Sequence, residues 1–314
     1  MCAAGILARF IIMPKFDPCL ICNSRNFKVL ASMVSPVLTK IENLRVSICK
    51  DCGFVTVNPK SRPDFFEYAN TEWFSKEAGA HEDETDRWEE FWGRVSNFVR
   101  PKKVLDVGPR YGQALAFIKK RVSGVECKAV ELVDELRDQL IRDHGVDARK
   151  FNINQSWPQD FSNFDLVIMR MIVEHLDNPV QVLRNVAQSL TPGGLIYVSV
   201  PNSLDIRPGM SMRTGYFRPI HAHYFNITSL TQMMNLASLY PVVAGEDRDV
   251  WGLFGKIPTK HKNSRVVNFE TQRDYLVSKL RESYWLDIKI IIKISLRQSK
   301  YIMALWRGFK RLRR

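Results

Sequence analysis

The sequence contains no uninterrupted hydrophobic run long enough to cross a lipid bilayer. A membrane-spanning helix needs about 20 consecutive apolar residues, and the apolar stretches near Ile11 and Ile290 are interrupted by Pro14 and Lys293. The opening stretch MCAAGILARFIIMP lacks a basic leader and a small-residue cleavage site. We therefore expect neither a membrane span nor an export signal.

Internal repeats and low-complexity tracts are also lacking, and 45% of the 314 residues are hydrophobic. A chain of this length and composition buries a substantial core and is longer than one ordinary domain. We therefore expect a folded protein with more than one structural unit.

Acidic residues are missing from the last part of the sequence, because no Asp or Glu follows Ile288. The basic residues of this tail are Lys289, Lys293, Arg297, Lys300, Arg307, Lys310, Arg311, Arg313 and Arg314. Much of the net charge of +13 therefore lies in the tail, and the rest of the chain is only mildly basic. The total charge alone does not predict nucleic acid as a partner.

Cysteine is scarce, but four of the six cysteines form two Cys-x-x-Cys pairs, Cys19 with Cys22 and Cys49 with Cys52. Each pair directs two thiolates toward one point, and two such pairs complete a tetrahedral zinc site. Without an export signal, thiols kept reduced for metal binding are favoured over disulfides. We predict a closed, structural zinc site and a cytoplasmic location. Four unrelated thiols or a redox pair are the alternatives.

The rest of the chain alternates between apolar runs and amphipathic stretches from Lys102 to about Val243. The runs KKVLDVG, CKAVEL, FDLVIM and LIYVSVP are typical of buried strands, and such alternation predicts a parallel sheet with helices on both faces. The expected layout is a four-cysteine module over residues 17–60, a helical connector over 61–100, an α/β domain over 101–245 and a C-terminal extension with a basic amphipathic helix over 246–314.

A ligand-binding turn is predicted where the first of these strands ends. The strand runs into Gly108 and Gly112, and glycines there let the backbone turn sharply and approach a ligand. The next strand ends in Glu131, whose carboxylate can accept hydrogen bonds from both hydroxyls of a ribose. The pattern predicts a nucleotide-like ligand.

These residues resemble the first two motifs of the class I S-adenosylmethionine-dependent methyltransferases. Asp106, Gly108 and Gly112 match the first motif, whereas Arg110 stands where its middle glycine is expected. The resemblance implies a doubly wound, Rossmann-like methyltransferase sheet and S-adenosylmethionine as cofactor. The cofactor-binding residues that it implies are Asp106, Gly108, Arg110, Gly112, Glu131, Asn152 and Arg170.

Two later stretches also resemble this family. FDLVIMRMIVEHLDNPVQVLRNVAQSLTPGGLIYVSVPN is similar to its fourth and fifth strands, and HAHYFNITSL is similar to its His-x-x-Tyr-Phe segment. With the cysteine module, the resemblance covers about Asp17 to Val243. It is closest in kind to enzymes that methylate nucleotide-activated sugars, glycans or small metabolites, so we expect a methyl acceptor oxygen, nitrogen or carbon in such a molecule and a role such as polysaccharide biosynthesis.

The candidate catalytic residues are His175, His221 and Tyr224. Methyl transfer requires an aligned acceptor and removal of its proton, and histidine titrates near neutrality. Either histidine is a candidate base, although His175 can instead support the cofactor loop through hydrogen bonds. Tyr224 orients the acceptor or packs beneath it. In related sugar C-methyltransferases a glutamate precedes the histidine that His221 matches; Ile220 stands there, which disfavours carbon methylation.

Other functions remain open at this stage. Arg110 in the glycine turn motivates a binding protein that has lost catalysis, and the four-cysteine module motivates an RNA methyltransferase, although the Asn-Pro-Pro-aromatic motif of amino-methylating nucleic-acid enzymes is absent. The tail, whose apolar residues from Ile294 to Leu312 share one helical face, is typical of a helix at the inner surface of a membrane. A helix packed on its own domain and an RNA-binding tail are the alternatives.

Overall fold

The computed structural model describes residues 16–33, 44–58, 85–259 and 266–298 of the chain. Its larger body is built on a seven-stranded sheet in the order β10-β11-β8-β7-β4-β5-β6. The strands are β4 (Lys103–Val107), β5 (Glu126–Val130), β6 (Asp147–Arg149), β7 (Phe164–Arg170), β8 (Leu190–Pro201), β10 (Tyr240–Glu246) and β11 (Asp249–Gly255). The strands from β4 to β8 are parallel, and the β10–β11 hairpin adds an antiparallel edge.

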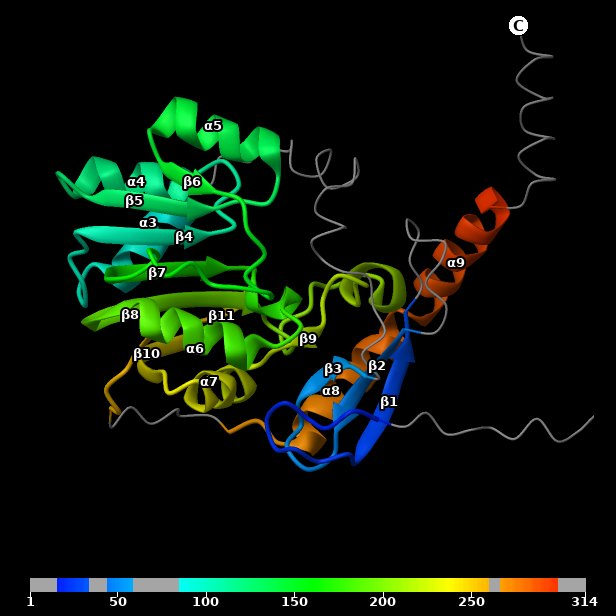
Figure 1. Ribbon diagram of the computed structural model, residues 1–314. Coiled ribbons are helices and arrows are strands. Elements are labelled where there is room, and N and C mark those ends of the chain that lie inside the picture. The colour runs from blue at the N-terminus through cyan, green and yellow to red at the C-terminus, as the bar shows by residue number, and fades with distance from the viewer. Residues whose placement is uncertain (1–15, 34–43, 59–84, 260–265, 299–314) are drawn as a thin grey trace, which may run out of the picture.

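Helices cover both faces of this sheet (Figure 1). They are α3 (Thr85–Val95), α4 (Gln113–Arg121), α5 (Asp134–His144), α6 (Pro179–Ser189) and α7 (Ile227–Leu236). Side chains of α3, α4 and α5 pack in one core with one face of the strands, whereas side chains of α6 and α7 pack in a second core with the other face. The doubly wound fold predicted from the alternating pattern is therefore confirmed.

Local sequence explains where several elements begin and end. Asn178 caps α6 by accepting a hydrogen bond from the Gln181 backbone N–H, with Pro179 at the first helical position. Asn226 and Ser229 form a reciprocal capping box at the start of α7. Gly145, with φ 56°, ends α5 in the left-handed conformation that glycine adopts readily.

The N-terminal module is a four-stranded antiparallel sheet in the order β1-β2-β3-β9. Its first three strands, β1 (Phe27–Ser32), β2 (Arg45–Cys49) and β3 (Val55–Val57), come from the predicted cysteine module. The fourth strand, β9 (His223–Tyr224), comes from the segment that leads into α7. The small sheet is thus completed by residues far away in the sequence.

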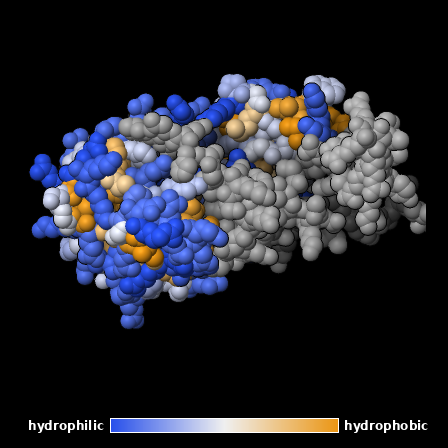
Figure 2. All heavy atoms as spheres, turned by 90° about the horizontal axis from the view of Figure 1, so that it is seen from above, coloured by the Kyte–Doolittle hydropathy of each residue, from blue (hydrophilic) through white to orange (hydrophobic). Residues whose placement is uncertain are grey.

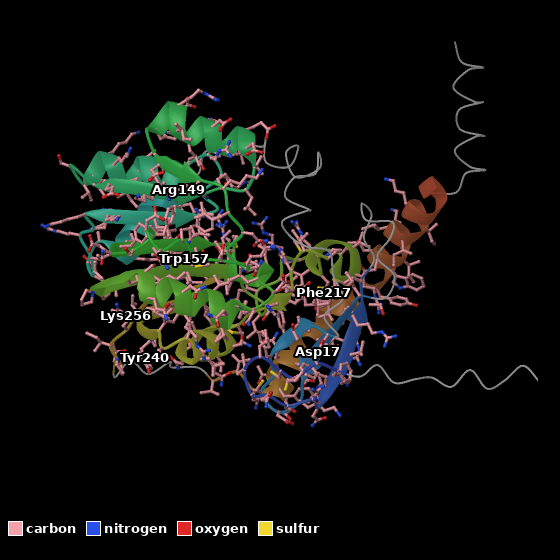
Figure 3. The ribbon with its side chains drawn as sticks, viewed as in Figure 1. Asp17, Arg149, Trp157, Phe217, Tyr240 and Lys256 are labelled. Atoms are coloured by element: carbon pink, nitrogen blue, oxygen red, sulfur yellow. The ribbon has the colours of Figure 1, made fainter. Side chains whose placement is uncertain are left out.

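Two helices end the described chain, and Figure 1 shows the first of them behind the strands of the N-terminal module and the second extending away from it. Helix α8 (Phe269–Glu282) contacts β1 and β2, and α9 (Tyr284–Gln298) contacts the short π-helix η2 (Met212–Tyr216). Helix α8 encloses a third core together with β1–β3 and β9, and this core contains Val46, Ile48, Phe217 and Leu276. Figure 3 shows Phe217 between the larger sheet and the N-terminal module.

The predicted boundaries between the units of the chain can be compared with the elements that the structure describes. The predicted start of the C-terminal extension, residue 246, falls inside the β10–β11 hairpin, so β11 belongs to the large sheet. The connector is described only from residue 85, where α3 begins, and the tail beyond residue 298 lies outside the described residues. In the parts that the structure describes, we find no helix with both the length and the apolar character to span a bilayer.

Candidate active site

The four paired cysteines converge at one end of the N-terminal module, where Figure 3 shows sulfur atoms close together. The Sγ atoms of Cys19 and Cys52 are 3.6 Å apart, those of Cys22 and Cys49 are 3.5 Å apart, and all four lie within 4.8 Å of one another. A zinc–sulfur bond of about 2.3 Å in a tetrahedron separates sulfurs by roughly 3.8 Å. The cluster therefore fits a structural zinc ion.

The predicted ligand turn lies at the carboxyl edge of the large sheet, between β4 and α4. Gly108 has φ 70°, and a Cβ atom there would meet Ile172 Cδ1 at 2.5 Å. Gly112 has φ 71°, and a Cβ atom there would meet Leu140 Cδ2 at 2.4 Å. Both positions therefore require glycine, one for the turn and one for the approach of α4 to α5.

Arg110 occupies the middle position of this turn in a conformation that glycine would favour. Its backbone has φ 54°, in the left-handed region, and its N–H donates a hydrogen bond to Glu131 Oε2 at 3.1 Å. Its side chain is exposed and lines the wall of a cavity without closing it. The arginine thus preserves the backbone shape of the motif while adding a positive charge at the cavity edge.

Glu131 is buried at the end of β5, with 4% of its surface exposed. Its two oxygens accept hydrogen bonds from the backbone N–H groups of Arg110 and Val133. Burial raises its pKa, although these hydrogen bonds counteract the shift. Each carboxylate oxygen has a second lone pair, so Glu131 can also accept hydrogen bonds from ribose hydroxyls.

Asp106 is buried in β4 beneath the same turn. Burial raises its pKa to about 7, with Arg170 lowering it and the Glu131 carboxylate raising it further. Arg170 ends β7, and its guanidinium lies 4.3 Å from the centre of the Trp88 ring. Asp106 thus lies beneath the cavity rather than in its wall, whereas Arg170 lines the cavity.

A cavity of about 880 Å³ runs from this turn to the segment before β9, where Ile220 and His221 line it. Of the predicted cofactor residues, five line it: Gly108, Arg110, Glu131, Asn152 and Arg170. Gly112 and Asp106 support the turn from outside the lining. The cavity is large enough for a nucleoside together with a second, small molecule.

The far end of the cavity contains both predicted histidines. Met171, directly after β7, has φ 52° and lies in the left-handed region that non-glycine residues rarely adopt. The chain then forms a short 3₁₀ turn over Val173–His175. His175 is buried, and its ring centre lies 4.8 Å from that of His221, so the two histidines meet edge to face at the cavity wall.

Tyr224, the third predicted catalytic residue, is not among the residues that line the cavity. It is buried in β9, where its hydroxyl accepts a hydrogen bond from the Arg218 N–H and donates one to the Arg218 carbonyl oxygen. A catalytic role for Tyr224 stays a prediction. Its observed contacts hold the segment that carries His221.

Glu174 is a cavity residue that the sequence analysis did not select. Only 1% of its surface is exposed, and burial raises its pKa to about 8. Among the described residues, neither of its carboxylate oxygens has a hydrogen-bond partner. The sequence feature that could have identified Glu174 is its position beside His175, immediately after a buried strand.

Comparison with known proteins agrees with the fold and the turn. A family model described as "Methyltransferase domain" matches residues 80–242. A "Probable S-adenosylmethionine-dependent methyltransferase" of Mycolicibacterium smegmatis is 27% identical over 195 residues, which cover 60% of this chain and 70% of that protein. A ubiquinone biosynthesis O-methyltransferase of Pseudomonas aeruginosa is 30% identical over 104 residues, 32% of this chain and 45% of that protein.

A solved structure, that of mitomycin 7-O-methyltransferase, shares 15% sequence identity and a TM-score of 0.44, covering 59% of this chain and 60% of that chain. The matched region of our chain thus spans less than two thirds of that structure. The family match, by contrast, covers more than half of our chain and includes the glycine turn, Glu131 and Glu174–His175. The chain belongs to the methyltransferase-domain family and is an S-adenosylmethionine-dependent methyltransferase.

Proposed function

We propose that this enzyme transfers the methyl group to a hydroxyl oxygen of a small polar acceptor, such as a sugar, a glycan precursor or another metabolite. The observation that carries the proposal is the continuous cavity that joins the glycine turn to the His175–His221 pair. The similarity of part of the chain to an O-methyltransferase supports oxygen over nitrogen or carbon as the acceptor atom.

The residues of the two cavity ends have different tasks. When bound, S-adenosylmethionine supplies a methyl group on a sulfonium, which is already a good leaving group. Glu131 binds the ribose, and the turn at Gly108 admits the nucleoside. The acceptor hydroxyl lies against the His175–His221 pair, where its proton leaves as the oxygen attacks the methyl carbon.

Charge at the outer part of the acceptor end suggests which acceptors fit. Arg207, Arg218 and Arg248 line the cavity and are exposed, together with Asp205 and the partly buried Asp249. The Asp249 carboxylate already forms an ion pair with Arg87. The positive groups therefore favour an acceptor that carries phosphate or carboxylate besides its hydroxyl, for example a nucleotide-activated sugar.

A transfer assay with methyl-labelled cofactor tests this proposal. The purified enzyme is offered separate pools of sugar nucleotides, neutral sugars, small hydroxylated metabolites and total RNA. We expect label in an acid-bearing hydroxyl acceptor, as an alkali-stable methyl ether. Label only in RNA, or on nitrogen or carbon, would contradict the proposal.

Substitution at His221 tests where the acceptor proton leaves. His221→Asn is expected to lower kcat by about 100-fold, because positioned proton removal contributes rates of that order. The Kd for S-adenosylmethionine, measured by calorimetry, should change by less than about twofold, because His221 lies at the other end of the cavity from Glu131. An unchanged kcat would remove the histidine pair from the proposal.

A catalytically inactive binding protein is the second candidate suggested by the sequence, because Arg110 stands where the middle glycine of the turn is expected. The structure favours the active enzyme, because the arginine side chain is exposed and the cavity beside it stays large. Undetectable binding of S-adenosylmethionine at millimolar concentration would reverse this conclusion.

We also propose a peripheral contact with an anionic membrane surface on the cytoplasmic side. In Figure 2 one hydrophobic patch lies toward the right of the coloured surface, on the side where Figure 1 places α9, and further patches lie at the left end. On α9, Trp285 is 76% exposed and Ile292 is 52% exposed, next to the exposed Lys289 and Lys293. Apolar and basic groups together suit anionic headgroups. Flotation with vesicles that contain phosphatidylserine, compared with neutral vesicles, tests the contact; equal recovery with both would contradict it.

A further inference from the structure

Three side chains that can bind a metal ion meet at the acceptor end of the cavity. Glu174, His175 and His221 each present one ligand atom, and these atoms all lie within 4.8 Å of one another. Glu174 and His175 are buried in the 3₁₀ turn after β7, and His221 reaches them from the segment before β9. The cluster is separate from the four-cysteine site.

The hydrogen bonding of His175 fixes which of its nitrogens faces the cluster. Its Nδ1 lies 3.0 Å from the Ile220 carbonyl oxygen, which can only accept, so Nδ1 carries the proton. In the neutral imidazole the lone pair is therefore on Nε2, which lies 3.8 Å from Glu174 Oε1. A ring N–H that donates to a backbone carbonyl is the arrangement that orients metal-binding histidines.

In this arrangement, hydrogen-bond acceptors of His175 and Glu174 point toward each other. The Nε2 lone pair of His175 faces a carboxylate oxygen that has no hydrogen-bond partner among the described residues. The charge that acts on Glu174 from a neighbouring element is that of Asp249, which is also a carboxylate. Burying such acceptors is costly unless a cation or proton lies between them.

We propose that Glu174, His175 and His221 bind a divalent first-row transition-metal ion, and that the acceptor hydroxyl completes its coordination. This inference rests on the proposed function, because it explains how the acceptor loses its proton. One carboxylate and two imidazoles favour Mn²⁺, Fe²⁺, Co²⁺ or Zn²⁺, whereas Mg²⁺ and Ca²⁺ prefer oxygen ligands alone. Three protein ligands leave positions open for the acceptor and for water.

The ion would act as a Lewis acid without changing its oxidation state. It lowers the pKa of the coordinated hydroxyl, whose proton passes to water. The acceptor oxygen then forms a bond to the methyl carbon while the carbon–sulfur bond breaks, and the electron pair of that bond stays on sulfur. The products are a methyl ether, a neutral thioether and one proton, so charge and atoms balance.

Binding of Mn²⁺ tests the site directly. Protein whose four-cysteine site is saturated with zinc, with the zinc content measured, is titrated with Mn²⁺, and the unbound ion is followed by electron paramagnetic resonance. We expect one Mn²⁺ per chain in addition to the zinc. Cobalt, whose visible spectrum reports nitrogen and oxygen ligands, is the second probe.

Three variants locate the bound ion. Glu174→Gln removes the carboxylate charge while keeping its shape, and His221→Asn removes a partly exposed imidazole; each should weaken Mn²⁺ binding by at least about tenfold. Glu126→Gln changes an exposed glutamate of β5 and should bind as the wild type does. Thermal unfolding identifies any variant that fails to fold. Equal binding by the wild type and by both His221→Asn and Glu174→Gln would overturn the site.

Activity separates this inference from the proposed function. If the protein binds no ion beyond zinc and still methylates a hydroxyl acceptor in the presence of a chelator that leaves the zinc in place, the metal site is wrong and the function stands. If Mn²⁺ binds with the expected variant pattern but no hydroxyl acceptor is methylated, the metal site stands and the proposed function fails.

Discussion

At the residue scale, the cofactor end of the cavity depends on the buried carboxylate of Glu131. It accepts hydrogen bonds from the backbone N–H groups of Arg110, after β4, and Val133, after β5, and it also lines the cavity. The same group therefore shapes the glycine turn and, in the function that we propose, offers lone pairs to the ribose.

Replacing this carboxylate should weaken cofactor binding. We expect Glu131→Ala to raise the Kd for S-adenosylmethionine by roughly 10-fold to 100-fold, because a hydrogen bond to a charged group contributes about 1.5–3 kcal/mol. Isothermal titration calorimetry measures the change, and Glu126→Ala, at the exposed start of the same strand, is the control. A Kd within twofold of the wild type would show that Glu131 does not bind the ribose.

Asp106 gives the folded protein a pH dependence with an unusual sign. Its pKa is about 7 in the folded protein, mainly because of burial, against an ordinary value of 3.8. Between these values the folded state holds a proton that the unfolded chain releases. Stability is therefore lost as pH rises from about 4 to 7, and the loss remains complete above pH 7.

The substitution Asp106→Asn should remove this loss. We compare the free energy of unfolding of the variant with that of the wild type at each pH. The difference should favour the variant by roughly 2–4 kcal/mol more at pH 8 than at pH 4. Urea denaturation at a series of pH values measures it. The neighbours Arg170 and Glu131 also face Asp106, and both stay unchanged in the comparison. A difference that does not vary with pH would disprove the effect.

At the element scale, α9 is held to the acceptor end of the cavity by one buried carboxylate. Asp287 accepts hydrogen bonds from the Ser211 hydroxyl, from the Ser283 hydroxyl at 2.7 Å and from the Arg213 backbone N–H at 3.0 Å. Ser211 and Arg213 begin η2, and Gly215 and Tyr216 of that turn line the cavity. The helix therefore supports a wall of the site.

Removing that carboxylate should destabilise the protein. We expect Asp287→Ala to lower the free energy of unfolding by roughly 2–4 kcal/mol, because it leaves buried donors without acceptors. Asp274→Ala removes a carboxylate from the exposed face of α8 and should cost less than about 0.5 kcal/mol. Chemical denaturation of both variants tests the comparison, and equal losses would argue against the role given to Asp287.

At the scale of the whole molecule, the N-terminal module is completed by β9, a strand from the segment between β8 and α7. The Thr56 hydroxyl of β3 lies 3.0 Å from His223 Nδ1 in β9 and donates to the Ala222 carbonyl oxygen. His221 directly precedes this pairing. The predicted cofactor-binding residues, in contrast, lie in the large sheet and in the loops that follow its strands.

Loss of the predicted zinc ion should therefore impair the two ends of the cavity unequally. We expect Cys52→Ser to lower kcat/KM for the acceptor by at least about tenfold, because small misplacements of catalytic groups are costly. The Kd for S-adenosylmethionine should stay within about twofold. Cys127→Ala, which removes a buried thiol of the large sheet, is the control. Equal losses at both ends would show that the module does not specifically support the acceptor side.

The sequence by itself determined the elements whose signals are local. The alternating apolar runs, the glycine turn at Gly108, the acid at Glu131 and the two cysteine pairs each lie within a short stretch, so backbone geometry and side-chain spacing decide their structure. These signals predicted the fold class, and the resemblance that they carry identified the methyltransferase family and five of the residues that line the cavity.

Only the tertiary structure decided which distant residues meet. His221 meets Glu174 because the Ala222 N–H donates to the Glu174 carbonyl oxygen, and Gln272 of α8 is buried where it hydrogen bonds Asn226 and Ser203. Such contacts depend on how separate elements bury their apolar faces together, and no local pattern records that choice. The exposed position of Arg110 and the buried position of Glu174, whose carboxylate has no hydrogen-bond partner within the described ranges, likewise result from packing, because burial is a property of the assembled fold.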